Sequence, residues 1–221
     1  FTAGISNNSI ANKEGAELSK VYMVGNVLID NIRFLQQRMQ RPAVMDQEHL
    51  EEGKYLLLTL NRKAIVNNIE EMKKLISTID GVARKAGIKV LAPLRGKALG
   101  FVLAFKAYQD VADHQSGIMV VQPQGYLDFS YLAAHAMGVI TDSGTVAEEA
   151  TFNGVPCITL NSYTEHQETV TVGTNELVAE DPEKLQLAME KIVKGEWKKA
   201  GIPDRWDGRS AERIVQIICG E

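Results

Sequence analysis

A run of small and polar residues, 142–145, follows an apolar segment that ends at Thr141 and opens directly into a helical pattern. Gly144 lets another group approach the backbone closely, and the first N–H groups of a helix carry partial positive charge. Together these features favour an anion site, typically for phosphate. The alternative is a plain capping box, with Thr145 as N-cap and Glu148 three residues later. The run is neither a P-loop nor a G-x-G-x-x-G dinucleotide fingerprint.

Glu149 lies one turn into the same helical pattern. A carboxylate at this position could accept hydrogen bonds from the two hydroxyls of a ribose. The alternative is a solvated acid that complements the helix dipole. Taken alone, the residue favours the second interpretation.

Three other loops also carry chemistry-bearing side chains. Asn61-Arg62-Lys63 follows Leu60, and the similar segment 93–97 contains Arg95 and Lys97. Two cations with an amide suit a phosphate, although a solvated turn is the simpler interpretation. The third loop, 161–168, is more polar than a short connection needs and contains His166. A lone loop histidine is more often solvated than functional.

Elements must bring these loops together, and the pattern predicts alternating strands and helices. The expected strands are continuous apolar runs, at 21–24, 55–60, 88–92, 117–121, 138–141, 157–160 and 176–178. Runs of this kind are typical of a parallel sheet covered by helices on both faces. The alternation predicts a doubly wound, mostly parallel, Rossmann-like α/β fold in a single domain over 1–221. In such folds ligands bind at the carboxyl ends of the strands, where the loops above would meet.

Helical spacing of apolar residues predicts the covering helices. One long helix carries Ile65, Ile69 and Ile79 on one face and is expected to end at Gly81 or Gly87. The segment 39–53 is expected to be a surface connection. The other expected helices are 27–38, 98–110, 126–137, 145–153, a short one near 165, 182–194 and 209–219.

Composition excludes several classes of protein. Apolar residues make up 45% of the 221 residues, so a disordered chain is not expected. The net charge is −4, from 24 Lys and Arg against 28 Asp and Glu, without a long basic run. Binding to nucleic acid or to a membrane surface through bulk charge is therefore not expected. No apolar stretch approaches the ~20 residues of a membrane-spanning helix.

The rare residues indicate no metal or disulfide. Cys157 and Cys219 lie in apolar runs and are expected to be buried free thiols, which suits the reducing cytoplasm. The histidines do not have metal-ligand spacing, so a zinc site is not expected; they are His49, His114, His135 and His166.

Several motifs, in order along nearly the whole chain, resemble the UDP-N-acetylglucosamine 2-epimerase family. The matching segments are Gly25-Asn26 with Ile29-Asp30, 122–129, 141–144, 148–150, 154–156, Thr164-Glu165 with Glu168, Gly173-Thr174, and 207–215. The resemblance implies half of a glycosyltransferase-B fold, with the active site in the cleft between two domains. This chain resembles the carboxyl-terminal half, and the family's catalytic carboxylates are expected on the other half. The start at Phe1, without Met, is then expected to be a cut near a domain boundary.

The resemblance also implies a reaction and a site. UDP is eliminated from the sugar nucleotide to give a 2-acetamidoglucal and then added back with inverted configuration at C2, without metal or nicotinamide cofactor. Ser143 and Gly144 would bind the diphosphate at the helix N-terminus, and Glu149 would hold the ribose. Phe129 and its neighbours would line the uracil pocket. Full-length family members are commonly dimers.

Three positions depart from the family pattern. Asn61 replaces a histidine that contacts the substrate, although Arg62 is kept. Thr145 replaces a glycine, and its side chain could crowd a phosphate. His166 replaces an arginine, so a permanent cation becomes a titratable one and UDP affinity is expected to weaken as pH rises.

Three functions follow from these observations. The first is the nucleotide-binding half of a UDP-N-acetylglucosamine 2-epimerase, inactive by itself. The second is half of a glycosyltransferase that uses the same fold and a nucleotide sugar. The third is a catalytically inactive UDP-sugar-binding module, which the changes at Asn61, Thr145 and His166 suggest.

Overall fold

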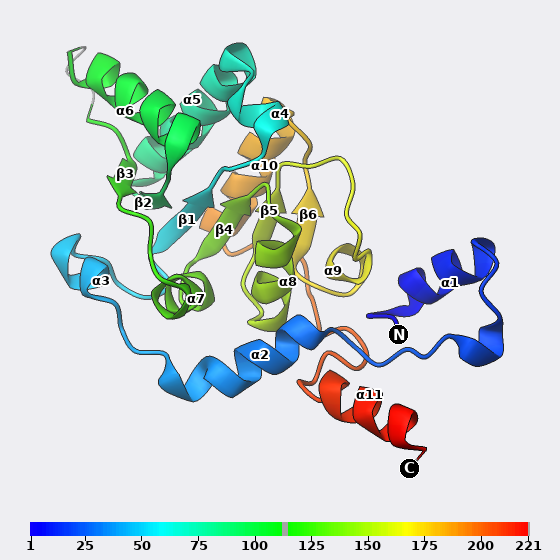
Figure 1. The fold of residues 1–221 in the computed structure, drawn as a ribbon. Coiled ribbons are helices and arrows are strands. Elements are labelled where there is room, and N and C mark those ends of the chain that lie inside the picture. Colours follow the sequence, from blue (N-terminus) through cyan, green and yellow to red (C-terminus); the bar gives the residue numbers. More distant parts are fainter. Residues whose placement is uncertain (112–114, 221) are drawn as a thin grey trace.

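The computed structural model describes residues 1–111 and 115–220, so His114 lies outside the described residues. Within those ranges six strands form one sheet in the order β3-β2-β1-β4-β5-β6 (Figure 1). Every neighbouring pair is parallel. The strands are β1 (Tyr55–Thr59), β2 (Lys89–Pro93), β3 (Ile118–Val121), β4 (Gly138–Thr141), β5 (Cys157–Thr159) and β6 (Asn175–Leu177). The predicted doubly wound, Rossmann-like sheet is confirmed.

The strand order places a topological switch point between β1 and β4. The chain builds outward from β1 to β3 and then returns to lay β4 on the other side of β1. Thr59 and Thr141 end these two strands as register partners, and their hydroxyl oxygens lie 2.7 Å apart. Doubly wound sheets bind their ligands in the crevice at this point, beyond the carboxyl ends of the strands.

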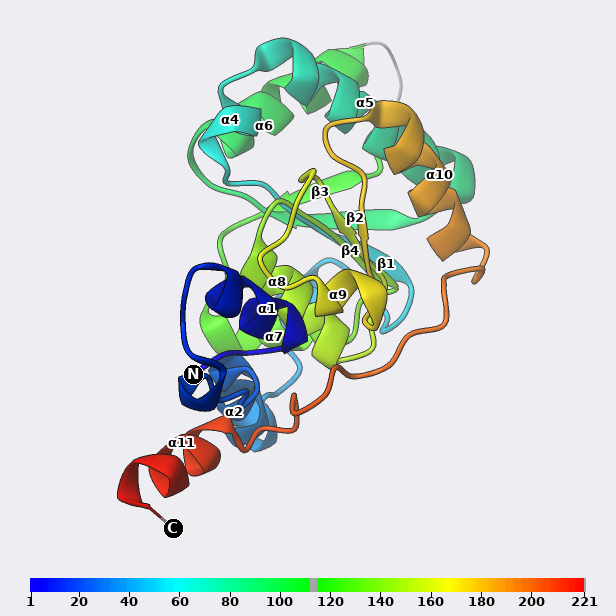
Figure 2. The same cartoon turned by 90° about the vertical axis from the view of Figure 1, so that its right-hand side faces the viewer.

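Helices cover both faces of the sheet, as Figure 2 shows from the side. Side chains alternate along each strand, so Leu56 and Leu58 of β1 enter one apolar cluster while Tyr55 and Leu57 enter another. The first cluster is closed by α5 (Ile69–Ala86), α6 (Gly96–Val111) and α10 (Pro182–Val193). The second is closed by α3 (Ala43–Gln47), α7 (Tyr126–Ala134) and α8 (Gly144–Phe152).

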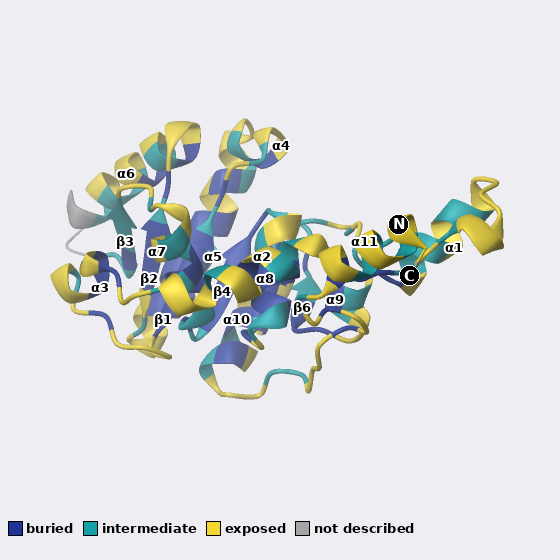
Figure 3. Ribbon diagram, turned by 60° about the horizontal axis from the view of Figure 1, so that its bottom comes forward, coloured by how far each residue is buried: buried dark blue, intermediate teal, exposed yellow. Residues whose placement is uncertain are grey.

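Segments from the two ends of the chain lie together outside α8. Helix α2 (Val27–Leu35), continued by η2 (Gln36–Arg38), packs on α8, and α11 (Ser210–Cys219) packs on α2. Ile29, Ile32 and Trp206 form a small buried cluster there, separate from the two clusters that pack on the sheet. Figure 3 shows the strands of the sheet as largely buried and much of the surrounding helices as exposed. The remaining amino-terminal elements are α1 (Ile5–Lys13) and η1 (Leu18–Lys20).

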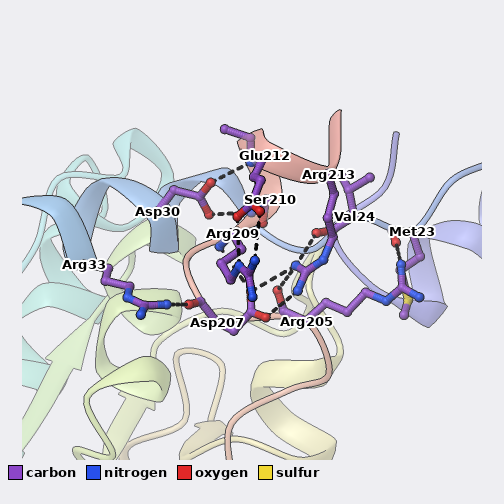
Figure 4. A network of polar contacts seen from close by, with 11 residues as sticks. Met23, Val24, Asp30, Arg33, Arg205, Asp207, Arg209, Ser210, Glu212 and Arg213 are labelled. Carbon is purple, nitrogen blue, oxygen red and sulfur yellow. Dashed lines mark hydrogen bonds and ion pairs between the residues drawn. The ribbon is translucent and has the colours of Figure 1, made fainter. Parts of the chain in front are cut away.

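A polar network fastens these two ends, and Figure 4 shows its side chains. The carboxylate of Asp30, on α2, accepts hydrogen bonds from the N–H groups of Ser210 (3.0 Å) and Ala211 (2.6 Å) at the start of α11. Arg213, on α11, donates to the carbonyl of Val24 (3.0 Å) and binds the carboxylate of Asp207. We call this network the terminal clasp.

Gly25 allows the backbone to pass close to Arg205 beside the terminal clasp. Its φ is +97°, and an added Cβ would lie 2.0 Å from the carbonyl oxygen of Arg205. Only glycine combines this backbone conformation with so close an approach. The family motif Gly25-Asn26 therefore has a structural cause.

Several expected boundaries are wrong. Residues 21–24 do not join the sheet; Met23 makes only an isolated bridge with Thr2. The segment expected as a surface connection contains α3, which buries Val44 and Met45. The expected long helix is divided into α4 (Lys63–Val66) and α5, which the Asn68 side chain caps.

The ends of other segments also differ from expectation. Of the two glycines expected to end α5, Gly87 is the one that does so, and its φ of +67° gives a left-handed C-cap. Helix α1 was not expected at all. Cys157 is buried as predicted, but Cys219, in the last turn of α11, is exposed. Among the residues that the model describes, no helix is long and apolar enough to cross a membrane.

Candidate functional site

Asp142 joins the two loops that flank the switch point. It follows β4 directly, is 8% exposed, and accepts hydrogen bonds from the N–H groups of Asn61 (2.7 Å) and Arg62 (2.6 Å), just after β1. Such charge-assisted bonds to a buried carboxylate are among the stronger ones in proteins. The loop after β1 is therefore held in a fixed position against the loop after β4.

The side chain of Arg62 is oriented by the loop after β5. Its Nη1 donates to Oδ1 of Asn161 (2.6 Å), and its guanidinium lies 5.5 Å from the ring centroid of Tyr163. Asn161 in turn donates to the carbonyl of Asp142 (3.2 Å). The carboxyl ends of three neighbouring strands thus share one hydrogen-bonded network that holds a cation.

Helix α8 begins inside this network. Ser143 is its N-cap: the hydroxyl accepts from the N–H of Val146 (3.5 Å), while the Ser143 N–H donates to the hydroxyl of Thr141 (3.0 Å). The capping box with Thr145 as N-cap is therefore wrong, because Thr145 already lies within the helix. With Val146 engaged by Ser143, the N–H groups of Gly144 and Thr145 are those left for an anion.

These groups open onto a cavity of about 340 Å³. It brings together four of the predicted site residues: Arg62, Gly144, Thr145 and His166. Space at Gly144 is open, since an added Cβ would meet no atom within 4 Å. The other lining residues are Asp142, Ala147, Glu148, Thr159, Asn161, Tyr163, Thr164, Glu165 and Asn175.

Glu148 and His166 form the wall of the cavity on the side of α2. Nε2 of His166 lies 3.6 Å from one oxygen of Glu148, and the other oxygen accepts a hydrogen bond from Nδ2 of Asn26. The ring of His166 also meets the indole of Trp206 edge-on, with centroids 6.0 Å apart. Burial raises the pKa of Glu148, and the attraction of His166 and the bond from Asn26 offset part of that rise.

Glu149 lies in a different neighbourhood from Glu148. It is 4% exposed, and burial together with the charge of Glu148 raises its pKa to about 7. After burial, the charge of Glu149 is the next cause that raises the pKa of Tyr126, which places the carboxylate beside α7. Phe129, also on α7, is partly buried against the second apolar cluster. The predicted ribose and uracil residues therefore both lie between α7 and α8, but neither they nor Ser143 are among the residues that line the 340 Å³ cavity.

The backbone and the side chain of Asn61 lie in different environments. Its N–H binds Asp142, but its exposed side chain lines a neighbouring hollow of about 580 Å³ with Lys63, Arg95 and Lys97. The structure therefore does not bring this amide to the cavity beside α8. The Pro93–Lys97 loop belongs to the same hollow.

Sequence reasoning missed residues that build the site without an obvious chemical motif. Asp142 is one of them, and its position as an acid directly after a buried strand is the pattern that could have indicated it. Asn161 and Tyr163 belong to the loop 161–168, whose polarity suggests a site but does not indicate which residues form it. The pairing of Asn26 with Glu148 joins positions 122 residues apart, and no local pattern indicates it.

The arrangement can bind an anion through backbone N–H groups, one oriented guanidinium and a histidine. No group of three or more His, Cys, Asp or Glu residues in the described ranges has the geometry to hold a metal ion. A parallel, doubly wound sheet with anion-binding groups at its switch point is typical of nucleotide-binding proteins of the Rossmann type. Comparison with known proteins narrows this class: residues 5–219 match the UDP-N-acetylglucosamine 2-epimerase family, and the chain belongs to it.

Curated relatives support the same family. The UDP-N-acetylglucosamine 2-epimerase of Methanococcus maripaludis is 31% identical over 95% of this chain and 57% of its own length. That of Methanocaldococcus jannaschii is 32% identical over 93% of this chain and 56% of its own length. The chain thus spans little more than half the length of these relatives.

A solved structure shows the same fold. The Methanocaldococcus jannaschii enzyme, crystallised with UDP-GlcNAc and UDP, matches with a TM-score of 0.82 and 30% identity. The match covers 100% of this chain and 60% of that one. The fold of this chain is therefore that of one half of a glycosyltransferase-B epimerase.

Proposed function

We propose that residues 1–221 form the nucleotide-sugar-binding domain of a UDP-N-acetylglucosamine 2-epimerase. One observation carries this proposal. The N-terminus of α8 and the oriented guanidinium of Arg62 face the same cavity at the switch point, and Asp142 holds their two loops together. A doubly wound sheet places a nucleotide at this point.

Each part of the ligand has a proposed partner. The N–H groups of Gly144 and Thr145, with the Ser143 turn and Arg62, receive the diphosphate. Glu149 accepts hydrogen bonds from the ribose hydroxyls, and Phe129 borders the uracil. His166, which lines the same cavity, faces the diphosphate. The side chain of Asn61 faces the neighbouring hollow and is assigned no part of the ligand.

The proposed reaction interconverts UDP-GlcNAc and UDP-ManNAc. The C2 proton is removed and the C1–O bond to UDP breaks, giving 2-acetamidoglucal and UDP; UDP then adds back while a proton returns to the opposite face of C2. No metal or nicotinamide is required. We assign the catalytic carboxylates to the part of the relatives' length that this chain does not span, so the 221 residues alone are expected to bind but not to turn over.

The family match favours the epimerase over the glycosyltransferase. We further propose a homodimer for the longer protein and a cytoplasmic location, where reducing conditions suit the free thiols of Cys157 and Cys219. Turnover at an ordinary enzymatic rate of ~1–10³ s⁻¹ by the longer protein would exclude the inactive module.

UDP titrated into the 221-residue chain, followed by calorimetry or NMR, tests the binding role. We expect weak but saturable binding. Arg62→Ala and Glu149→Ala should each weaken it about tenfold, because each removes a hydrogen bond to or from a charged group.

Glu196→Ala is the matched control, since Glu196 is an exposed acid outside the cavity. It should bind UDP like the unchanged chain. Absence of saturable binding, with Glu149→Ala indistinguishable from the unchanged chain, would refute the proposed role.

A further inference from the structure

Glu148 is a cavity-wall residue held from both sides. Its Oε2 accepts from Asn26 on α2, and its Oε1 faces Nε2 of His166 in the loop before α9 (Glu168–Thr171). Its carboxylate therefore has a fixed position in the wall that the diphosphate must approach. A fixed negative charge there opposes binding of a second anion.

Asn26 determines which way this carboxylate is held. Its Oδ1 accepts from the N–H of Leu28 (3.0 Å) as the N-cap of α2, so its Nδ2 is the group that donates to Glu148. The adjacent Gly25 and Val24 are held by the terminal clasp. Glu148 consequently has little freedom to turn away from the cavity.

His166 is the cationic group that faces Glu148. Its side chain is 21% exposed, it packs against Trp206, and its buried Nδ1 has no hydrogen-bond partner among the described atoms. The other charged groups around the pair are mainly acidic: Glu165 and Glu168 from its own segment, Glu149 from α8 and Asp142 from the β4 loop. Among the described residues that line the cavity, Arg62 is the permanent cation that faces them. Without a proton on His166, this wall of the cavity has an excess of negative charge.

We propose that Glu148 is a positioning residue that holds the protonated imidazole of His166 at the cavity, so that the diphosphate of a nucleotide sugar binds together with a proton on His166. This inference rests on the proposed function. Glu148 acts on the ligand only through His166, and the two residues together determine how the affinity for the ligand changes with pH.

The direction of the pH dependence of affinity follows from the linkage between binding of the ligand and binding of the proton. A histidine ordinarily changes charge between about pH 5 and 8, and a bound anion favours its protonated form. Affinity is then greatest at acidic pH and falls as the proton is lost. If the ligand shifts that equilibrium by about one pH unit, affinity falls about tenfold. Glu149, whose pKa is about 7, acts in the opposite direction, because its ionised form accepts ribose hydroxyls better.

The test measures affinity for UDP-GlcNAc at pH 6, 7 and 8 by calorimetry. This probe has no terminal phosphate group to titrate in that range. For the 221-residue chain we expect affinity to fall about tenfold from pH 6 to pH 8. In His166→Arg this fall should disappear, because the charge is permanent, and only the opposing rise with pH from the ionisation of Glu149 should remain.

Glu148→Gln distinguishes the pair from a histidine that simply binds phosphate. Glutamine keeps the bond from Asn26 but removes the charge, so we expect the fall to shrink to less than about twofold. His166→Gln should bind weakly at every pH, and adding Glu148→Gln to it should restore affinity. His49→Asn, which removes an exposed histidine before β1, is the control and should keep the tenfold fall.

The outcomes separate this inference from the proposed function. No binding of UDP-GlcNAc by the unchanged chain at any pH contradicts the proposed function itself. Binding whose pH dependence persists in Glu148→Gln, or a double variant no better than His166→Gln, overturns the pairing and leaves the nucleotide site standing. Thermal unfolding of each variant checks that the chain remains folded.

Discussion

Glu148 and Glu149 are neighbours in the chain, yet α8 turns their carboxylates toward different neighbours. Successive residues on a helix point about 100° apart, so one carboxylate meets Asn26 and His166 while the other lies toward α7. Both are buried, and burial raises the pKa of each. At the scale of single residues, burial of these two carboxylates lowers the stability of the folded chain when they are ionised.

Glu149→Gln should stabilise the unliganded chain at neutral and basic pH. Burial raises the pKa of Glu149 to about 7 in the folded chain, from its ordinary value of 4.5, so its contribution to stability is full below pH 4.5 and is lost as pH rises through 7. The loss amounts to about 3 kcal/mol. Glutamine does not ionise, so the melting temperature of Glu149→Gln relative to the unchanged chain should rise from pH 5 to pH 8, by roughly 2–4 °C per kcal/mol. Calorimetric melting curves measure it.

The exposed Glu196 is the control: Glu196→Gln should show no pH-dependent difference. A Glu149→Gln chain whose relative melting temperature stays constant with pH would contradict the buried position of this carboxylate.

How far the residues of the site were predictable depends on how local their environment is. The N–H groups at the start of α8 follow from a strand, a small-residue turn and a helical pattern, all within a few positions. The burial of Glu149 depends on α7 and was not predictable from its own surroundings, which favoured a solvated acid. The family resemblance, not the residue pattern, pointed to its role.

At the scale of elements, Asp30 links α2 to α11. Its two oxygens accept the N–H groups of Ser210 and Ala211, doing from another helix what an N-cap residue does locally. Arg209, at the N-cap position of α11, makes no side-chain capping bond. The side chain of Asp30, on α2, therefore caps the N-terminus of α11.

Asp30→Ala should loosen α11 while leaving the sheet in place. Loss of a capping carboxylate costs about 1 kcal/mol. Hydrogen exchange followed by mass spectrometry should show faster exchange over 210–219, with the strands unchanged. Asp46→Ala, on α3, serves as the comparison, since Asp46 is an exposed acid that pairs with Arg41. Unchanged exchange over α11 in Asp30→Ala would show that packing alone holds the helix.

The elements that sequence reasoning located best are those whose apolar pattern is regular. All strands of the observed sheet coincide with expected ones within a residue or two, because each is a continuous apolar run. Residues 21–24 have a similar run, but within them Met23 pairs with Thr2 and not with a strand of the sheet. Helix α3 is five residues long, too short for its spacing to be visible. Asn68, a side-chain cap, interrupts a pattern that otherwise continued from Ile65 to Ile79.

At the scale of the whole molecule, the switch point divides the sheet into two halves that meet at β1 and β4. One half is β3-β2-β1 and the other β4-β5-β6, and the cavity takes its residues from both. A ligand that contacts Arg62 and the start of α8 together would bridge the halves. Binding should therefore stabilise the whole chain and not one loop alone.

UDP should raise the melting temperature of the chain. At a concentration of about 100 times Kd, a ligand that binds only the folded state adds about 2.7 kcal/mol, which corresponds to several degrees for a chain of this length. Differential scanning fluorimetry with UDP and with uridine measures it, and uridine should give a smaller shift because it lacks the diphosphate. Equal shifts with the two ligands would contradict an anion site at α8.

The terminal clasp has a mechanical consequence. The two ends of the chain leave the molecule on the same side (Figure 1), and the hydrogen bonds of Asp30 and Arg213 lie between them and the sheet. A load on the carboxyl-terminal end would first shear α11 away from α2, whereas a load on the amino-terminal end would first reach the bonds of Ser6 to Glu168. The strands would bear that load only afterwards. Because Val24 and Gly25 adjoin Asn26, the partner of Glu148, and Glu168 lies two residues after His166, tension on either end would reach the wall of the cavity beside α8 before it reached the core.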